Sequence, residues 1–381
     1  PDVIMAADYL IDMGPGAGSD GGRVVAQGTP AKIARGSTVT GKSLRGRRYK
    51  AEPRRQPLEW ITIRGARENN LRAEKVSLPL GVLGGVCGVS GSGKSTLIID
   101  TLARVVAPKK QTTSVARETI EPGRHDAIEG APDRCILLDQ TAAGVGSPAG
   151  FLNLRKPLQQ LYAASEDARS LGIKADTFSD RCSACKGGGY QRLDMGFLPG
   201  VHQVCEACNG SGYQAEIGEI KLRGVSLPDL LEKTVAEVLQ LWRDETRIAS
   251  VLQTLCDVGL GYLVLHQPAR TLSGGEIQRL KIARELTKRS GANTLYLLDE
   301  PTFGLHMADV GQLLSVLERL LAAGSSVIVV EHNLDMLVAC DWLVELGPGG
   351  GPDGGRIIAS GTPERLAEQK TATGTCLHEL M

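Results

Sequence analysis

An α/β fold organised around a nucleotide-binding core is predicted by two features of the sequence. An apolar run at residues 81–87 leads directly into the glycine-rich loop 88–95, and a helical pattern follows that loop. Further along, apolar runs at residues 294–298 and 327–330 each end in acidic residues and alternate with helical segments. Alternation of short buried strands with helices is typical of a parallel sheet covered by helices.

The composition is that of an ordinary globular protein with more than one domain. The chain has 381 residues, 42% of them hydrophobic, with 43 basic and 43 acidic residues. The balanced charge gives no sign of a polyanionic partner, although it is compatible with a local basic patch. No apolar run approaches the roughly 18–20 residues that cross a bilayer, and the first residues do not form a signal sequence. We therefore expect a cytoplasmic protein with no membrane partner.

The chain contains an internal repeat. Residues 1–30 and 334–363 align without a gap at a constant offset, with 16 identical positions. Each copy reads as a strand, a glycine-rich turn, a second strand and a Gly-Thr-Pro helix start. We therefore expect residues 1–36 to be the tail of an upstream domain that resembles the one at the end of the chain.

The remaining sequence predicts a core that is interrupted by an insertion. Residues 37–57 are rich in Arg, Lys and Pro and read as a basic linker, either solvated or in contact with phosphates. The first part of the core is expected at residues 58–104 and the second part at 271–381. Residues 105–270 are expected to form the insertion, with a cysteine-rich module at about 180–214.

The loop from residue 88 to 96 has the spacing of a phosphate-binding loop between a strand and a helix. Its backbone amides are expected to surround phosphate oxygens, Lys94 to reach the β and γ phosphates, and Ser95 to contact Mg²⁺. The predicted nucleotide-binding residues of this loop are Gly88, Ser90, Gly91, Gly93, Lys94, Ser95 and Thr96.

Three further motifs follow in the second part of the core. The sequence LSGGE opens a helix, so that Ser273, Gly274 and Gly275 present a hydroxyl and amides to a γ-phosphate on a facing domain. The strand 294–298 ends in Asp299, a candidate Mg²⁺ ligand, and Glu300, a candidate general base. His332 follows the next strand, where it is placed to touch the γ-phosphate.

Four cysteines form two C-x-x-C pairs with 19 residues between them, and each pair continues as C-x-x-C-x-G-x-G. This spacing favours a tetrahedral structural Zn²⁺ site, although reduced core thiols or redox chemistry remain as alternatives. The predicted metal ligands are Cys182, Cys185, Cys205 and Cys208. Lys186, Tyr190 and Arg192 lie on the segment between the pairs and are candidate nucleic-acid contacts.

Taken together, these motifs resemble those of the ABC ATPase superfamily. The stretches ITIRGARENNL, GVSGSGKSTLI, LSGGEIQRLKIARELTKR, TLYLLDEPTFGLH and VIVVEHNLDML resemble the second nucleotide-binding domain of the UvrA family, the damage-recognition subunit of nucleotide excision repair. The resemblance implies an ABC-type ATPase fold with an inserted signature and zinc region, and it implies ATP, Mg²⁺ and Zn²⁺ as cofactors. It also assigns Gln140 to the position of the Q-loop glutamine.

The partners that the resemblance implies are double-stranded DNA, an upstream ABC domain or a homodimer partner, and a UvrB-type protein bound through the missing half. The ATP site is then shared between two domains, so this chain alone is expected to hydrolyse ATP weakly.

The chain departs from the family in two places. Two arginines that usually follow the Q-loop are absent after Gln140, and Phe303 replaces a more common threonine. These departures leave a second hypothesis open, a UvrA-like paralogue that removes DNA-bound drugs. A transporter subunit and an inactive truncated product are two further alternatives.

Overall fold

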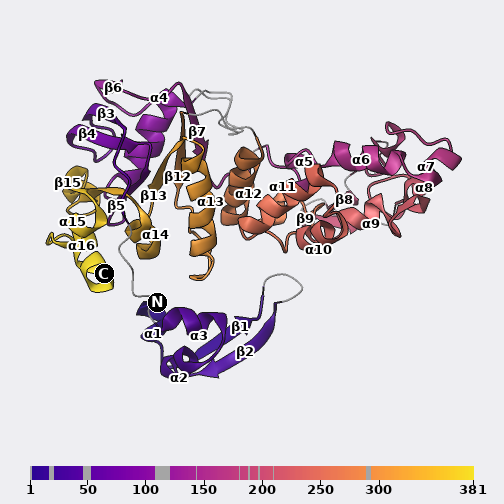
Figure 1. Cartoon of the computed structure of the whole chain (residues 1–381), viewed down its shortest axis with the longest axis horizontal. Helices are drawn as coiled ribbons and strands as arrows, with labels where there is room; N and C mark the ends of the chain where they lie inside the picture. Colours follow the sequence, from indigo (N-terminus) through magenta and orange to yellow (C-terminus); the bar gives the residue numbers. More distant parts are fainter. Residues whose placement is uncertain are drawn as a thin grey trace. The chain divides into compact units, whose positions relative to one another are not determined.

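The computed structural model describes residues 2–16, 21–45, 53–107, 121–142, 144–179, 181–187, 189–195, 198–208, 210–288 and 293–381. The chain divides into two compact units (Figure 1). Unit 1 consists of residues 1–144, 257–259 and 273–381, and unit 2 of residues 145–256 and 260–272.

Unit 1 is built on a six-stranded sheet with the order β15-β14-β5-β13-β12-β7. The bounds are β5 (Leu83–Gly88), β7 (Arg134–Leu138), β12 (Thr294–Asp299), β13 (Ser326–Val330), β14 (Trp342–Gly347) and β15 (Arg356–Gly361). All neighbours pair in parallel except β14 and β15. Because β5 and β13 are buried on both faces, they read as continuous apolar or glycine runs rather than alternating ones. The predicted α/β fold is confirmed.

Helices cover this sheet and complete the core. A π-helical segment η2 (Thr96–Ala103) continues as α4 (Arg104–Val106) and contacts β7 and β12. Helices α12 (Gly274–Thr287), α13 (Val310–Ala322) and α14 (Leu334–Ala339) contact β7, β13 and β5 respectively (Figure 1). Leu97, Ile98 and Leu102 of η2 are fully buried against the sheet. The apolar spacing after the phosphate loop therefore fixes this helix on the core.

A second, three-stranded sheet has the order β4-β3-β6 and packs beside η2. Its strands are β3 (Glu59–Ala66), β4 (Ala73–Leu80) and β6 (Ala127–Glu129). Strand β7 belongs to the central sheet through its pairing with β12. The predicted insertion, residues 105–270, therefore begins too early in the sequence, because β7 of the central sheet lies inside it.

The two copies of the internal repeat have the same local structure. Strands β1 (Leu10–Gly14) and β2 (Arg23–Gly28) form an antiparallel hairpin like that of β14 and β15. Both hairpins carry a register shift at the same repeat position, between Asp12 and Met13 and between Glu345 and Leu346. Helices α1 (Asp2–Met5) and α2 (Pro30–Arg35) flank the first hairpin, and α14 and α15 (Pro363–Ala367) flank the second.

Helix α3 (Val39–Leu44) lies inside the predicted linker 37–57 and contacts α2. At the repeat offset, α3 corresponds to the start of α16 (Ala372–Leu380). The capping threonines Thr38 and Thr371 correspond as well, since each accepts a hydrogen bond from the amide three residues later. The repeat thus extends to residue 44, and the predicted boundary after residue 36 is too early.

The described end of the predicted linker, residues 53–57, is bound to the core by its arginines. The Arg54 side chain is 10% exposed and pairs with Glu364 at 2.6 Å. Arg55 pairs with Glu318 and with Asp341. The solvated-connector interpretation is therefore wrong at these two residues, because acidic side chains far along the chain meet them. Residues 46–52 lie outside the described part of the chain.

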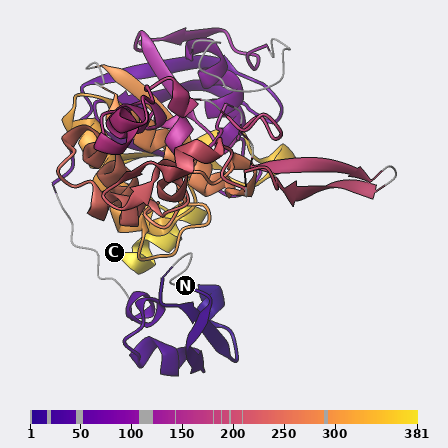
Figure 2. The same cartoon turned by 90° about the vertical axis from the view of Figure 1, so that its right-hand side faces the viewer.

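Unit 2 is mainly helical, with one short and one longer hairpin. Its helices are α5 (Pro148–Phe151), α6 (Arg155–Ala163), α7 (Glu166–Ser170), η3 (Thr177–Ser179), α8 (Ala215–Glu219), α9 (Leu227–Leu231), α10 (Val235–Leu241), α11 (Thr246–Asp257) and η4 (Ala269–Thr271). Strands β10 (Lys221–Leu222) and β11 (Val225–Ser226) form one hairpin, and β8 (Tyr190–Met195) and β9 (Leu198–Val204) form the other. Figure 2 shows β8 and β9 as a long two-stranded ribbon.

The core of unit 2 gathers three aromatic side chains. Tyr162 of α6 lies between Phe178 and Trp242, with ring centroids 6.1 and 6.3 Å away. All three are nearly fully buried.

No helix among the described residues has the length and apolar character needed to cross a membrane.

Candidate nucleotide site and cysteine cluster

The phosphate loop begins where β5 ends, at Gly88. This glycine has φ +130°, and a Cβ there would lie 2.0 Å from the carbonyl oxygen of Leu346 on the neighbouring strand β14. Any other residue would clash with that backbone, so the chain turns sharply at this point. The turn directs the following amides into a cavity instead of back into the sheet.

Lys94 is 5% exposed, and its ammonium group donates hydrogen bonds to the carbonyl oxygens of Gly88 at 3.0 Å and Val89 at 2.9 Å. Burial lowers the pKa of Lys94, while the nearby carboxylates of Glu300 and Asp299 act in the opposite direction. The loop therefore holds a positive charge in place by its own carbonyls, next to two acidic groups.

A cavity of about 420 Å³ opens above the loop. Its lining residues come from the loop, from the ends of β12 and β13, and from the segment after β3, and they are Asn69, Asn70, Ser90, Gly91, Gly93, Lys94, Ser95, Thr96, Glu300, His332 and Gly351. Predicted site residues from three separate motifs are thus brought together. Six other predicted site residues are not part of this lining: Gly88, Gln140, Ser273, Gly274, Gly275 and Asp299. The roles assigned to all of these residues stay predictions.

Asp299 ends β12 and is mostly buried. Burial, followed by repulsion from Glu300, raises its pKa to about 6. Its Oδ1 atom is buried and has no hydrogen-bond partner among the described residues. A buried, unpaired carboxylate oxygen beside the phosphate loop fits a hydrated Mg²⁺, because this ion prefers oxygen ligands and keeps several waters.

The raised pKa of Asp299 predicts a stabilising substitution. The folded protein binds this proton more tightly than the unfolded chain, so the charged carboxylate weakens folding as pH rises through about 6. In the absence of Mg²⁺, Asp299→Asn is expected to stabilise the fold by about 2 kcal/mol at pH 8 and to have little effect near pH 4. Thermal melts of both proteins across this pH range test it. A variant that is no more stable at pH 8 would contradict the assignment.

Glu300 follows Asp299 directly and has φ +45°, a backbone conformation that is strained for a glutamate. Its carboxylate lies 3.5 Å from Nε2 of His332. Burial is the main cause that lowers the pKa of His332, and Lys94 lowers it further. The lowered pKa favours the neutral form of the imidazole beside this carboxylate.

Glu331, which the sequence analysis did not assign, holds two loops of the site. It is 2% exposed, and it accepts backbone hydrogen bonds from Thr302 at 2.8 Å, His332 at 2.8 Å and Asn333 at 3.0 Å. It thereby ties the segment after Glu300 to the segment that carries His332. Its position directly after a buried strand was the signal available in the sequence.

Replacing Glu331 by Ala is expected to lower the free energy of unfolding by about 3 kcal/mol, because three amide groups lose a buried charged acceptor. Urea denaturation measures this loss. Glu368→Ala, at an exposed position, is the control. A loss for Glu331→Ala as small as that of the control would contradict the positioning role.

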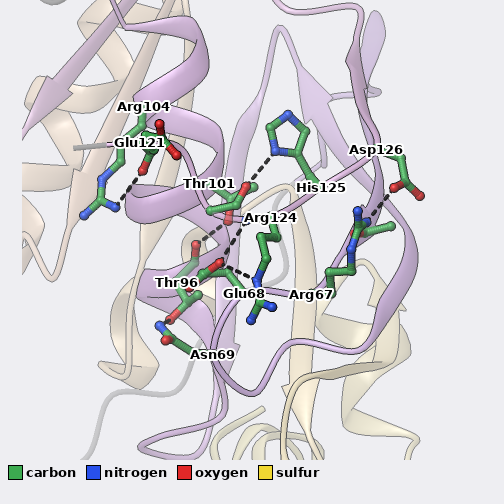
Figure 3. Close-up of polar contacts among 12 residues, drawn as sticks. Arg67, Glu68, Asn69, Thr96, Thr101, Arg104, Glu121, Arg124, His125 and Asp126 are labelled. Carbon is green, nitrogen blue, oxygen red and sulfur yellow. Dashed lines mark hydrogen bonds and ion pairs between the residues drawn. The ribbon is translucent and has the colours of Figure 1, made fainter. Parts of the chain in front are cut away.

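Two asparagines that the sequence analysis also did not assign hold the entrance of the loop. Asn70 donates to the carbonyl oxygens of Gly91 and Gly351, both at 2.9 Å. Asn69 donates to the Thr96 hydroxyl at 3.3 Å, at the first turn of η2 (Figure 3). The segment after β3 is therefore hydrogen-bonded to the phosphate loop at two places, Gly91 and Thr96.

The preceding residue, Glu68, is fixed by an arginine in turn. Its carboxylate accepts from the backbone and the side chain of Arg124, each at 3.0 Å (Figure 3). These bonds lower the pKa of Glu68. The turn that carries Asn69 and Asn70 is thus tied to residues 121–126, and these residues come from beyond η2.

The residues predicted to form the signature, Ser273, Gly274 and Gly275, lie at the start of α12, close to Gln140, the predicted Q-loop glutamine. Ser273 caps the helix, and its own amide donates to Glu276 at 2.6 Å. A Cβ on Gly274 would lie 2.7 Å from Oε1 of Gln140, so these segments touch. Gln140 also donates to the backbone oxygen of Glu300 at 3.4 Å. Gln140 therefore lies against the start of α12 and is hydrogen-bonded to Glu300, the residue after β12.

Gln278 also links α12 to the central sheet, at a fully buried position. Its side chain is fully buried, and Nε2 donates to the carbonyl oxygens of Leu138 at 2.7 Å and Asp299 at 2.8 Å. It joins α12 to the ends of β7 and β12. No pattern in the sequence distinguishes it from other polar residues of this helix.

The four cysteines of the C-x-x-C pairs form a cluster in unit 2, with all sulfur atoms within 4.8 Å of one another. The paired distances are 3.9 Å between Cys182 and Cys205 and 3.7 Å between Cys185 and Cys208. Backbone amides lower the pKa of Cys182 to about 7, whereas burial raises the pKa of Cys205 to about 11. Four converging sulfur ligands fit a tetrahedral Zn²⁺.

The glycines of each pair support this cluster. The amides of Gly189 and Gly212 donate to the sulfurs of Cys185 and Cys208 at 3.3 and 3.2 Å. Such bonds orient the ligands of a metal site. Tyr190 is 43% exposed on β8 and Lys186 is exposed, whereas the Arg192 side chain lies outside the described part of the chain.

The parallel sheet, the phosphate loop and the signature helix define an ABC-type ATPase fold. A family model described as "ABC transporter" matches residues 209–303. UvrABC system protein A of Methanothermobacter thermautotrophicus is 44% identical, and the match covers 100% of this chain and 40% of that protein. The Staphylococcus aureus protein of the same name is 42% identical, covering 100% of this chain and 41% of that protein.

The crystal structure of UvrA2 from Deinococcus radiodurans matches with a TM-score of 0.87 and 38% identity, covering 100% of this chain and 47% of that chain. All 381 residues of this chain are thus homologous to part of UvrABC system protein A. It spans about two fifths of the length of these curated relatives.

Proposed function

We propose that this chain is the ATP-hydrolysing, DNA-binding part of a UvrA-type protein, in which ATP turnover controls the recognition of DNA damage. The observation that supports it most is the 42–44% identity to UvrABC system protein A across the entire chain. The relatives' name refers to a multi-protein system, and the resemblance in sequence extends the proposal to a UvrB-type partner. The drug-resistance alternative is not favoured, because the named relatives are UvrABC system proteins.

In the proposed reaction, loop amides and Lys94 bind the phosphates of ATP. Glu300 accepts a proton from the attacking water, and His332 orients this carboxylate and reaches the γ-phosphate. Ser95 and Asp299 would hold Mg²⁺, which neutralises charge on the phosphate oxygens. Gln140 would report the occupancy of the site to unit 2.

The signature residues Ser273, Gly274 and Gly275 are proposed to serve an ATP bound to a facing ABC domain. They do not line the cavity above this chain's own phosphate loop. The facing domain is either an upstream ABC domain of the same protein or a second copy of this chain. The cysteine cluster is proposed to hold a structural Zn²⁺ that fixes the ribbon of β8 and β9 for contact with DNA.

The experiment that tests this function measures affinity for a duplex of about 50 base pairs, with and without a bulky lesion, at fixed salt. DNA affinity is compared in ATP, ADP and a non-hydrolysable ATP analogue. The control protein is Lys94→Ala, in which the effect of nucleotide on DNA affinity should be lost. The proposal predicts that nucleotide changes DNA affinity and that Lys94→Ala abolishes the change. DNA binding that is insensitive to nucleotide in the unmodified protein would contradict it.

A further inference from the structure

Unit 2 contains a cavity of about 640 Å³ that belongs to neither the phosphate loop nor the cysteine cluster. It lies between α6, the first cysteine pair, the segment after the second pair and the start of α11. Its lining residues are Gly150, Asn153, Arg155, Lys156, Pro157, Gln159, Gln160, Phe178, Arg181, Gly187, Gly212, Tyr213 and Arg247. This volume is in the range of small-molecule sites.

The charge of the lining has one sign. Arg155, Lys156, Arg181 and Arg247 contribute four positive charges, and the lining contains no Asp or Glu. Lys156, Arg181 and Arg247 are exposed, and none of them forms an ion pair with another residue in the described ranges. Cations that converge on a concave surface without counter-charges produce a local field that attracts anions.

Arg155 is held in place by neutral groups. Its guanidinium donates to Nδ1 of His266 at 3.0 Å, to the Tyr213 hydroxyl at 3.4 Å and to the Ser147 hydroxyl at 3.4 Å. Burial and the two arginines Arg155 and Arg181 lower the pKa of His266, so the ring is an uncharged acceptor. These neutral acceptors therefore orient Arg155, and no carboxylate among the described residues neutralises its positive charge.

Two acidic residues shortly before Arg247 act on another arginine. Asp244, shortly before Arg247, forms an ion pair with Arg223 at 2.5 Å, and Glu245 also acts electrostatically on Arg223. Four thiolates around a Zn²⁺ would carry a net charge of minus two, which the four cations of the cavity exceed. The lining residues that the structure describes thus carry an excess of positive charge.

We propose that this cavity is a second phosphate-binding site, separate from the phosphate loop, which receives a phosphate group carried by a ligand of nucleotide size. Guanidinium groups bind phosphate oxygens through two parallel hydrogen bonds, and Arg155, Arg181 and Arg247 bring three of them to this cavity. Two sources share this chemistry, a free phosphorylated small molecule and the phosphate of a nucleic acid.

The cysteine cluster shapes one wall of the cavity. Arg181 immediately precedes Cys182, whose amide donates to the carbonyl oxygen of Gly212 at 2.9 Å. Gly212 lines the cavity and donates in turn to Cys208. The inference rests on this geometry and does not require the proposed ATPase function.

The test uses the full chain carrying Lys94→Ala, which weakens phosphate binding at the loop. Isothermal titration with inorganic pyrophosphate is expected to show one binding site per chain. The double variant Lys156→Gln/Arg247→Gln is expected to weaken this binding by about tenfold or more, since charged hydrogen bonds are lost. Arg181→Gln is expected to have a similar effect. Arg169→Gln on α7, a basic residue outside the lining, is the control.

Circular dichroism melts and zinc content are recorded for each variant, so that loss of folding is separated from loss of binding. No binding by the Lys94→Ala protein, or equal weakening by Arg169→Gln, would overturn the proposal. So would unchanged binding in both the double variant and Arg181→Gln. Competition then identifies the source: displacement of pyrophosphate by thymidine monophosphate alone indicates a small molecule, and displacement by duplex DNA indicates a backbone phosphate.

Discussion

Replacing Glu300 by Gln is expected to lower ATP turnover by about 100-fold or more, while ATP affinity stays within about threefold. Gln is nearly the same size as Glu but accepts no proton from water at neutral pH. The carboxylate lines the cavity 3.5 Å from His332, whereas the phosphates are expected to contact the loop and Lys94. Single-turnover hydrolysis and equilibrium binding of a fluorescent ATP analogue measure the two quantities separately.

The matched control for this prediction is Glu368→Gln, the same chemical change at an exposed position after α15. It should leave both quantities unchanged. Undiminished hydrolysis by Glu300→Gln would remove Glu300 from the role of general base. A loss of ATP affinity equal to the loss of turnover would instead indicate a binding role.

Replacing Cys205 by Ser is expected to release the metal and to unfold the cysteine module. Loss of a residue that supports a metal ligand typically costs 10–100-fold in affinity, so loss of a ligand itself should cost more than about 100-fold. Cys205 is fully buried directly after β9, and its amide donates to the carbonyl oxygen of Gly189, directly before β8, at 2.9 Å, so it lies where the two strands of the ribbon join the cluster. Zinc content by mass spectrometry and hydrogen exchange of residues 181–213 measure both effects.

Cys376→Ser is the control, since this cysteine is exposed and lies outside the cluster. It should retain one zinc per chain. Full zinc content in the Cys205→Ser protein, or unchanged exchange protection of residues 181–213 after the metal is removed by a chelator, would show that the cluster is not a structural zinc site.

The sequence predicted those parts of the fold and site whose signal is local. The phosphate loop needs glycine at Gly88 because of a single backbone contact, and the cysteine spacing follows from the geometry of two tight pairs. The central strands were recognisable because burial on both faces makes them continuously apolar. The repeat was visible because its turns require the same glycines in both copies.

Other features depend on contacts between distant segments and carry no local signal. Strand β7 was assigned to the insertion because only its pairing with β12 shows that it belongs to the sheet. Helix α3 was missed because residues 31–38, which lead into it, share few identities with residues 364–371, although Thr40, Gly41 and Leu44 recur as Thr373, Gly374 and Leu377. Glu331 and Gln278 were not assigned because their role lies in the backbone groups that they bind.

Arg54 and Arg55 illustrate the same limit for charge. A run of basic residues predicts solvent or phosphate equally well, and only the folded chain brings Glu364, Glu318 and Asp341 to them. Their pairing attaches residues 53–57 to the core.

We propose that this chain supplies one face of an ATP site and the signature face of another. The most direct test is the specific ATPase activity of the purified chain as a function of its concentration. If a facing ABC domain completes the site, activity per molecule is very low at nanomolar concentration and rises as the chain associates with itself. Activity per molecule that is high and independent of concentration, from a protein shown to be monomeric, would contradict the claim.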